Sequence, residues 1–243
     1  MDTDNPNLDL DGVVVPDLVH RLAAGREVEP VWRNLIGGVT FSIGGGAEYV
    51  KYGPPHAEFD AEPEFARLRW LSAYVAAPRP IDHGLDDSGN RWLRTEGLPG
   101  TSAVLGGWHD RPEVVVPELG RALRRLHDRV PVQGCPWEWS IAGRLEYAGR
   151  PADTLGPWPA LDLVVCHGDA CNPNFLLDPS GTCVGYVDLG RLGVADRWAD
   201  LAPALLSLGW NFGEGWEPAL LDGYGIAPDP GKQDFYTRLW NLA

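Results

Sequence analysis

The chain has 243 residues, 44% of them hydrophobic, and it carries 34 acidic against 20 basic residues for a formal net charge of −14. This length can bury a substantial core and suits one bilobal unit or two intimate lobes. The negative charge argues against a nucleic-acid partner, because phosphate backbones attract basic patches. It permits a cationic small molecule as substrate.

The N-terminal residues and the spacing of the cysteines indicate the cellular compartment. Met1 is followed by acidic residues rather than by a basic and then apolar leader, and no apolar run approaches the ~18 residues that a membrane span needs. The four cysteines contain no Cys-x2-Cys pair, so we expect free thiols in a reducing compartment. These features predict a cytoplasmic protein with no membrane partner. We expect a monomer or weak dimer.

The order of the predicted elements divides the chain into three parts. Residues 1–12 are acidic and polar and predict a flexible N-terminus. A short helix at about Pro16–Ala24 begins a strand-rich lobe with one main helix, residues 13–96. Residues 97–243 form a second, mostly helical lobe. We find no internal repeat and no low-complexity segment.

The first lobe contains an isolated lysine. Gly37–Gly46 predicts a loop and hairpin, and Glu48–Tyr52 alternates as a strand that carries Lys51, the only lysine before Lys232. Since the other basic residues here are arginines, a lone lysine on an apolar strand favours a phosphate ligand over a surface residue. Thr40, in the same hairpin, is a plausible phosphate-facing hydroxyl.

Glu64 opens an amphipathic stretch that includes Phe65, Leu68 and Leu71, so it can sit on a helix and face Lys51. The alternative is a first-turn carboxylate that the helix dipole favours, and both interpretations can hold together. Arg91–Arg94 then predicts a strand that runs into the Gly/Pro turn Thr95–Gly100.

A long helix is predicted near the start of the second lobe. Pro117 can occupy its first turn, and Leu119, Leu123 and Leu126 recur at helical spacing. His127 ends this pattern, and we expect a buried, hydrogen-bonded histidine rather than a catalytic one, because no nucleophile pattern accompanies it.

The most informative stretch follows the apolar run Leu161–Cys166. His167-Gly168 breaks this run into a loop that carries Asp169, and a hairpin of Phe175–Leu177 and Thr182–Val187 comes next. Asn174 enters the hairpin and Asp188 leaves it, so a tight turn can bring the three polar side chains together.

These three side chains suit phosphoryl transfer. Magnesium takes oxygen ligands and usually bridges nucleotide phosphates through one or two protein groups, which Asn174 and Asp188 can supply. Asp169 can accept the proton of an attacking hydroxyl. Each residue alone could simply cap a turn or end a strand. Together, Asp-x4-Asn and the later Asp-Leu-Gly match the catalytic and metal loops of the kinase superfamily. The sequence therefore predicts an α+β, bilobal, protein-kinase-like fold.

A kinase fold gives the upstream residues their expected roles. The lobe of residues 13–96 would bind the nucleotide, with Lys51 on its phosphates and Glu64 as the partner of Lys51. The turn after Arg94 lies where a kinase has its hinge, so the backbone at Thr95 and Gly97 would contact the adenine. The lobe of residues 97–243 would hold the catalytic and substrate-binding groups.

The last third of the chain is rich in aromatic residues. Asp200–Leu208 predicts a helix with an apolar face, and Asp200 is expected to anchor backbone near the catalytic loop. Trp210, Phe212, Trp216 and Trp240 follow. We expect core positions for them, although tryptophans near a substrate site can also stack on sugar rings.

The chain resembles the aminoglycoside phosphotransferase family, most closely the 3′-phosphotransferases of the kanamycin and neomycin resistance type. The long motifs that carry the resemblance are His167–Asn174 and Asp188–Leu201. Weaker similarity covers Lys51, Glu64–Leu71, Leu126-His127 and Phe235–Leu239, so most of the chain is included.

The resemblance implies an enzyme that transfers the γ-phosphate of ATP or GTP, with Mg²⁺, to an aminoglycoside hydroxyl, in the 3′ position, and so confers antibiotic resistance. It makes Asp169 the catalytic base, Asn174 and Asp188 the magnesium ligands, and Lys51 with Glu64 the phosphate-binding pair. It places Arg191 near the transferred phosphate, where a guanidinium can offset charge. The alternative for Arg191 is a structural pairing with Asp196 or Asp200.

Two departures from the family concern the acceptor. Leu239–Ala243 lacks the acidic pair that the resistance enzymes carry before their terminal aromatics, and residues 145–160 replace a longer helical hairpin that contributes acids to the drug pocket. Two alternatives therefore stay open: a kinase of another small hydroxyl or amino-sugar metabolite, and a nucleotide-binding module with a reduced acceptor site. A metal hydrolase built on His167 and Asp169 is more distant, since no second histidine cluster is near.

Overall fold

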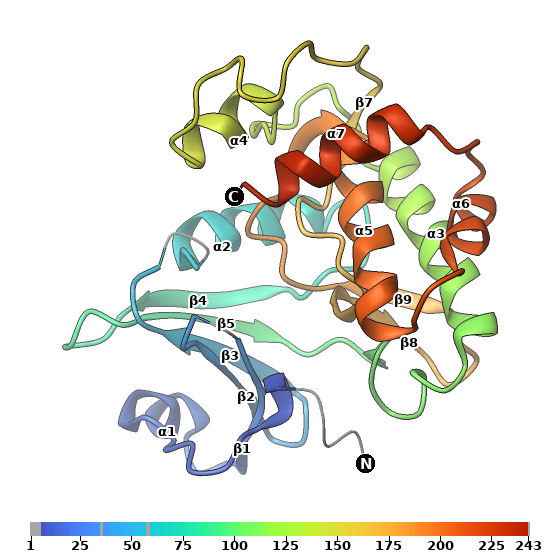
Figure 1. Ribbon diagram of the computed structural model, residues 1–243. Coiled ribbons are helices and arrows are strands. Elements are labelled where there is room, and N and C mark those ends of the chain that lie inside the picture. Colours follow the sequence, from blue (N-terminus) through green and yellow to red (C-terminus); the bar gives the residue numbers. More distant parts are fainter. Residues whose placement is uncertain (1–5, 35, 57–58, 243) are drawn as a thin grey trace. The chain divides into compact units, whose positions relative to one another are not determined.

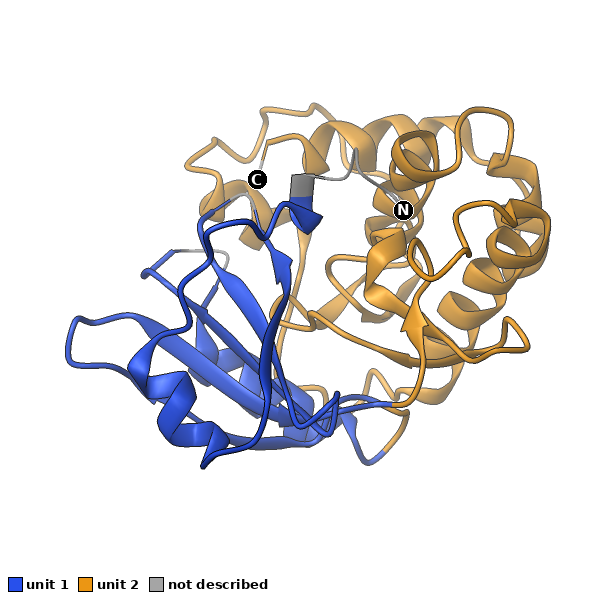
Figure 2. Cartoon of the chain, turned by 90° about the horizontal axis from the view of Figure 1, so that it is seen from below, with its two compact units in different colours: residues 1–73, 77–98 blue, residues 74–76, 99–243 orange. Residues whose placement is uncertain are grey.

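The computed structural model describes residues 6–34, 36–56 and 59–242. The chain forms two compact units: unit 1 comprises residues 1–73 and 77–98, and unit 2 comprises residues 74–76 and 99–243 (Figure 2). The sequence placed the border between lobes after residue 96. Of the predicted N-terminal segment 1–12, residues 1–5 lie outside the described part, and Pro6–Leu8 forms a short 3-10 helix, η1.

Unit 1 is built on an antiparallel sheet of five strands in the order β1-β2-β3-β5-β4 (Figure 1). Two helices, α1 and α2, accompany it. The bounds of these elements are α1 Asp17–Ala23, β1 Val28–Arg33, β2 Val39–Ile43, β3 Glu48–Gly53, α2 Ala61–Leu71, β4 Pro80–Leu85 and β5 Arg91–Glu96.

Side chains alternate along β3, so one face of the strand packs in the core and the other carries Lys51. Val50 belongs to a core cluster with Val19 of α1 and Phe41 of β2. Its neighbour Lys51 therefore points to the opposite face, because successive residues of a strand alternate. Glu64 of α2 meets Lys51 on that face.

Unit 2 contains five α-helices among its described residues, with two small sheets that order as β10-β7 and β6-β8-β9. Helix α3 packs against α6, and α5 packs against α7 (Figure 1). The bounds are β6 Thr101–Ser102, α3 Pro112–Arg129, α4 Ile141–Tyr147, β7 Leu163–Cys166, η2 Asn172–Asn174, β8 Phe175–Leu177, β9 Cys183–Tyr186, β10 Gly193–Asp196, α5 Trp198–Asn211, α6 Glu217–Tyr224 and α7 Pro230–Trp240.

Helix α3 begins earlier than the sequence suggested. The prediction that Pro117 lies in the first turn is wrong, because Pro112 takes that position and Pro117 lies inside the helix. Proline costs an interior turn one backbone hydrogen bond, yet the apolar residues on this face are buried, and burial of that face outweighs the loss. Leu119, Leu123 and Leu126 are all buried, as their spacing predicted.

The contact between α3 and α6 requires glycine on both helices. A Cβ atom on Gly120 would overlap the carbonyl oxygen of Leu220, and one on Gly223 would overlap the carbonyl oxygen of Pro117. The two backbones therefore approach more closely than any larger residue would allow.

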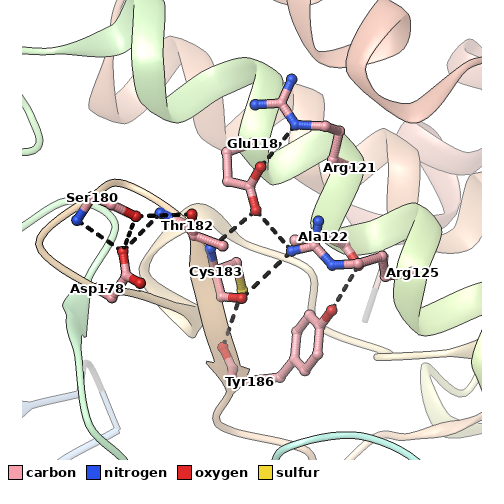
Figure 3. Close-up of polar contacts among 10 residues, drawn as sticks. Glu118, Arg121, Ala122, Arg125, Asp178, Ser180, Thr182, Cys183 and Tyr186 are labelled. Carbon is pink, nitrogen blue, oxygen red and sulfur yellow. Dashed lines mark hydrogen bonds and ion pairs between the residues drawn. The ribbon is translucent and has the colours of Figure 1, made fainter.

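A buried carboxylate holds the β8–β9 hairpin to α3. One oxygen of Glu118 accepts hydrogen bonds from the backbone N–H of Cys183 at 3.0 Å and from Arg125 at 2.7 Å, and the other accepts one from Arg121 at 2.8 Å (Figure 3). Below it, the Tyr186 hydroxyl donates to the carbonyl of Ala122. Burial alone would raise the pKa of Glu118, but these donors lower it overall.

The turn of the same hairpin is closed by its own side chains. Asp178 accepts hydrogen bonds from the backbone N–H groups of Ser180 and Thr182 (Figure 3). This explains the reversal that the sequence predicted at residues 178–181, since a short carboxylate can satisfy the orphan amides of a turn. The hairpin is thus fixed at both its turn and its helix-facing side.

We expect Glu118→Gln to lower the free energy of unfolding by about 1–3 kcal/mol at neutral pH, because two arginines and a backbone amide lose their charged partner. A group with a depressed pKa stabilises the fold above its unfolded value and loses that effect as the pH falls through its folded pKa. The deficit of the variant should therefore shrink as the pH falls below 4.5. Urea denaturation at several pH values measures it, with exposed Glu113→Gln of the same helix as control. A deficit that stays constant down to acid pH would contradict this account.

Candidate active site

The loop that carries Asp169 leaves strand β7 through a conformation that only glycine accepts readily. Gly168 has φ +86°, and a Cβ atom there would overlap the backbone carbonyl of Arg191. The loop that carries Asp169 and the segment that carries Arg191 are therefore in backbone contact at this point.

Asp200, at the start of α5, fixes the same loop. Its carboxylate accepts hydrogen bonds from the backbone N–H of His167 at 2.6 Å and from that of Gly168 at 2.9 Å. The Nε2 atom of His127 lies 3.0 Å from one of its oxygens. Burial would raise the pKa of Asp200, but the hydrogen bond from His127 and the other donors lower it overall. The expectation that Asp200 anchors backbone here is met.

His127 is buried and hydrogen-bonded, as the sequence indicated. Its ring is buried and bridges Asp200 to the hydroxyl of Tyr224, which lies 2.8 Å from Nδ1. Cys166 completes a compact buried group of potential metal ligands with His127 and Asp200. The oxygens of Asp200 already accept hydrogen bonds from the backbone, so this group holds the loop.

Asp169 is half-buried. Its Oδ1 atom is buried and has no hydrogen-bond partner among the described residues, while its backbone N–H donates to Nδ1 of His167 at 3.3 Å. Burial, and after it the charge of Asp188, raises the pKa of Asp169. A carboxylate in this setting is a stronger base than one in water.

Asn174 and Asp188 lie next to Asp169, as the hairpin predicted. The side-chain amide of Asn174 donates to the backbone carbonyl of Asp169 at 2.9 Å, and the backbone carbonyl of Asn174 accepts from the N–H of Val187 at 3.0 Å. Asp188 follows directly, with φ +61°. This left-handed conformation costs a non-glycine residue energy, and such strain clusters at functional sites. Unit 2 thus gathers two carboxylates and an amide.

Arg191 packs on aromatic rings beside this group. Its guanidinium carbon lies 5.4 Å from the ring of Trp139 and 5.6 Å from that of Tyr147. Its charge also reaches Asp169, whose pKa it lowers slightly against the larger effects. The alternative partner Asp200 is occupied by backbone donors, and Asp196 accepts from Lys232 at 2.6 Å.

One residue of this neighbourhood carried no signal in the sequence. Arg144 of α4 is 1% exposed, and its guanidinium carbon lies 5.3 Å from the ring of Trp139. An arginine on a short helix with exposed neighbours reads as a surface residue. Only a pattern of tryptophans and arginines shared by α4, α7 and the loop before α4 could have singled it out.

Of the aromatic residues expected in the core, Trp210 and Trp240 lie in different environments. Trp210 is 66% exposed, so the expected core position is wrong for it. It lies near the end of α5, where the helix face turns away from the core. Trp240 is partly buried and joins the cluster around Arg144 and Arg191.

In unit 1, Lys51 and Glu64 form the expected pair. The ammonium nitrogen of Lys51 lies 2.7 Å from Oε1 of Glu64, whose side chain is buried, whereas that of Lys51 is partly exposed. Thr40 of β2 lies directly across the sheet from Lys51. Cross-strand neighbours share one face, so the Thr40 hydroxyl and the Lys51 ammonium group face the same side.

The predicted hinge residues lie at the end of β5. Thr95 is buried, and the backbone N–H of Gly97 donates to the carbonyl of Ala47 at 2.9 Å. A Cβ atom on Gly97 would overlap the carbonyl oxygen of Gly46, so the turn between β2 and β3 packs closely against this segment. The structure therefore places Gly97 where only glycine fits.

Comparison with known proteins identifies the family. The model of the phosphotransferase enzyme family, APH, matches residues 39–154 and 148–236. The chain belongs to this family. An aminoglycoside 3′-phosphotransferase of Streptomyces fradiae is 34% identical over 84% of this chain and 90% of the relative. A streptomycin 3″-kinase of Streptomyces griseus is 32% identical over 94% of this chain and 95% of the relative.

Solved structures agree with this assignment. The crystal structure of aminoglycoside-3′-phosphotransferase of type VIII aligns with a TM-score of 0.76 at 29% identity, covering 93% of this chain and 98% of that one. Aminoglycoside phosphotransferase APH(3″)-Id from Streptomyces rimosus, in complex with ADP and streptomycin, aligns with a TM-score of 0.69 at 27% identity, covering 94% of this chain and 99% of that one. The predicted kinase-like fold and phosphotransferase class are confirmed.

We expect Asp200→Asn to lower the free energy of unfolding by about 3–5 kcal/mol, because removal of one partner leaves buried donors without a charge to bind. Urea denaturation followed by far-UV circular dichroism gives the value. Asp222→Asn, an exposed carboxylate on α6, should stay within about 0.5 kcal/mol of the parent. If the two variants are equally stable, Asp200 does not anchor the loop.

Proposed function

We propose that the protein transfers the γ-phosphate of ATP or GTP to a hydroxyl of an aminoglycoside, in the 3′ position, and thereby confers resistance to the drug. The observation that carries the proposal is the grouping of Asp169, Asn174 and Asp188 on one loop and hairpin of unit 2. The relatives named as aminoglycoside phosphotransferases support the choice of acceptor.

Asp169 is the proposed catalytic base. Its raised pKa and its buried, unpartnered Oδ1 suit a carboxylate that accepts a proton from an incoming hydroxyl. Phosphoryl transfer needs little covalent chemistry from the protein, so orientation of this one oxygen is its main contribution. The hydrogen bonds from His167 and Gly168 to Asp200 supply that orientation.

The donor set fits magnesium. Asp188 offers a carboxylate, and Asn174 offers an amide oxygen whose orientation is set because its NH₂ group donates to the Asp169 carbonyl. Hard oxygen donors of this kind are those that Mg²⁺ prefers, and the mutual repulsion of two neighbouring carboxylates favours a cation beside them. When bound, the ion would offset negative charge on the phosphates.

Unit 1 is proposed to bind the nucleotide. The ammonium group of Lys51 would contact the phosphates while Glu64 holds it in place, and the Thr40 hydroxyl on the same face would add a hydrogen bond. The backbone of Thr95 and Gly97 is proposed to contact the adenine. Arg191 is proposed to offset charge on the transferred phosphoryl group.

We expect Asp169→Asn to lower kcat with kanamycin or neomycin by about 10²–10⁴-fold, because the amide cannot accept the hydroxyl proton. Drug-dependent release of ADP measures the rate, and mass spectrometry with NMR locates the phosphate. The matched control is Asp110→Asn, an exposed carboxylate of unit 2. No turnover above the Asp169→Asn level with any aminoglycoside would refute the proposed acceptor, and phosphate transfer to a 3′-deoxy analogue would refute the position.

We expect Lys51→Ala to weaken binding of ATP by about 10–100-fold, since a charge-assisted hydrogen bond to phosphate contributes about 1.5–3 kcal/mol. Isothermal titration calorimetry gives the dissociation constant. Arg69→Ala removes an exposed positive charge from the neighbouring helix and should leave it unchanged. Equal affinities for the two variants would remove Lys51 from the nucleotide site.

A second candidate keeps the chemistry and changes the acceptor to another small hydroxyl or amino-sugar compound. It is favoured by the segment of residues 239–243, which has no acidic residue, and by the short segment of residues 145–160. The buried Arg144 beside these segments adds positive charge where the resemblance leads one to expect acids. A screen of acceptors with labelled ATP separates the candidates, because phosphate on aminoglycosides alone excludes the second.

A further inference from the structure

Arg144 is a buried charge that has no hydrogen-bond partner among the residues that the structure describes. The residue is 1% exposed, and none of its three guanidinium nitrogens donates a hydrogen bond to a described residue. Burial, followed by the charge of Arg191, lowers the pKa of Arg144 to about 10. Buried charges are almost always paired with an opposite charge or a hydrogen-bond acceptor. The described residues supply no such partner to this guanidinium.

Aromatic rings surround this charge but do not neutralise it. The guanidinium carbon of Arg144 lies 5.3 Å from the ring of Trp139 and 5.8 Å from that of Trp240. Arg191 lies 5.4 Å and 6.0 Å from the same two rings. Cation–π contacts stabilise a charge by less than its removal from water costs, so the rings offset only part of that cost. Two like charges therefore share one aromatic enclosure.

The other polar groups of the enclosure are also donors. The indole Nε1 of Trp139 and the hydroxyl of Tyr236 are buried and have no hydrogen-bond partner among the described residues. Tyr236 lies on α7 one turn before Trp240, whose ring is 5.8 Å from the Arg144 guanidinium carbon, and α7 contacts α4. A tryptophan N–H and a guanidinium cannot accept a hydrogen bond, so the groups cannot satisfy one another fully.

We propose that Arg144, with Arg191, Trp139, Tyr236 and Trp240, forms a binding site for an oxyanion, either a carboxylate or a phosphate group. Such a group offers several lone pairs and a negative charge, and a guanidinium binds it through two parallel hydrogen bonds. A cation would add to the repulsion between the arginines. A neutral ligand would leave the charge of Arg144 without a counterion.

The proposed site lies beside a surface residue and beside the loop that carries Asp169. Tyr147, three residues after Arg144 on α4, is 41% exposed, and its ring contacts Trp139 and Arg191. Helices α4 and α7, which carry Arg144 and Tyr236, contact each other (Figure 1). The backbone of Arg191 contacts Gly168, which precedes Asp169. An oxyanion here would lie beside the proposed base.

Two sources could supply the oxyanion. It is either free inorganic phosphate or an acidic group on a hydroxylated acceptor, and only the second source depends on the proposed phosphotransferase activity. The net charge of −14 disfavours general attraction of anions, so binding would require these particular donors.

The test measures binding of inorganic phosphate and of gluconate to the full chain by isothermal titration calorimetry at constant ionic strength, without nucleotide. Glucose serves as the neutral ligand. We expect saturable binding of at least one of the two anions, weakened at least tenfold in Arg144→Met and unchanged in Arg238→Met, an exposed arginine on α7. Equal binding by the two variants, or no saturable binding of either anion, would overturn the proposal.

Thermal unfolding separates this role from a structural one. Without anions, Arg144→Met should be as stable as the parent or more so, because an apolar side chain replaces an unpaired charge. The anion that binds should raise the Tm of the parent and not that of the variant. Tyr236→Phe removes only a buried hydroxyl and should fold normally but bind the anion more weakly. If Arg144→Met is destabilised and Tyr236→Phe binds as the parent does, Arg144 serves packing alone.

A final measurement distinguishes the two sources. Gluconate is incubated with Mg-ATP, and mass spectrometry detects a phosphorylated product. Product formed by the parent, and lost in Arg144→Met, assigns the site to the acceptor. Binding of phosphate without such a product assigns it to the free anion. Because binding is measured without nucleotide, it can succeed even if aminoglycoside turnover fails.

Discussion

The carboxylate of Asp200 accepts hydrogen bonds from two consecutive backbone N–H groups, those of His167 and Gly168. These groups lie just past the end of β7, where no strand remains to pair them. A buried amide without a partner costs about 1–3 kcal/mol, so the loop is stable in this course only while the carboxylate is charged and in place. His127 and Tyr224 hold the carboxylate in turn. The direction of the Asp169 side chain follows from this chain of contacts.

The hairpin gives the second boundary of the site. Glu118 ties the backbone at Cys183 to α3, so the strand that ends before Asp188 is fixed to the largest helix of the unit. Asp188 can then keep its left-handed backbone, because the residues on both sides of it are held. Two buried carboxylates on separate helices, Glu118 and Asp200, thus position the polar groups of the proposed active site. Neither needs to touch a substrate.

Local patterns in the sequence predicted much of this arrangement. The β7 run, the turn at residues 178–181, the strand that carries Lys51 and the helix that carries Glu64 are each encoded by a few neighbouring residues, and all are present. The start of α3 was misplaced, because the interior Pro117 reads as a helix start unless the burial of the turn before it is known. Trp210 was assigned to the core because composition does not tell which face of α5 it occupies.

The enclosure around Arg144 could not be predicted for a different reason. Its members come from three separate parts of the chain, and no spacing joins Trp139 and Arg144 to Arg191 and Trp240. The ion pair of Lys51 and Glu64 was predictable because a lone lysine on an apolar strand and an acid at the start of a helix each have few roles open to them. An arginine among many arginines carries no such signal. Only the structure shows that these common residues, far apart in the sequence, lie side by side.

The scarcity of lysine has a practical consequence. The chain has two lysines, and each is bound to a buried carboxylate: Lys51 to Glu64, and Lys232 to Asp196. A reagent that acylates primary amines therefore meets two side-chain targets, one in each unit, with Lys51 the more open to solvent at 27% against 15%. Peptide mapping after brief labelling would give a site-resolved record of the environment of Lys51, with Lys232 as an internal reference in the same molecule.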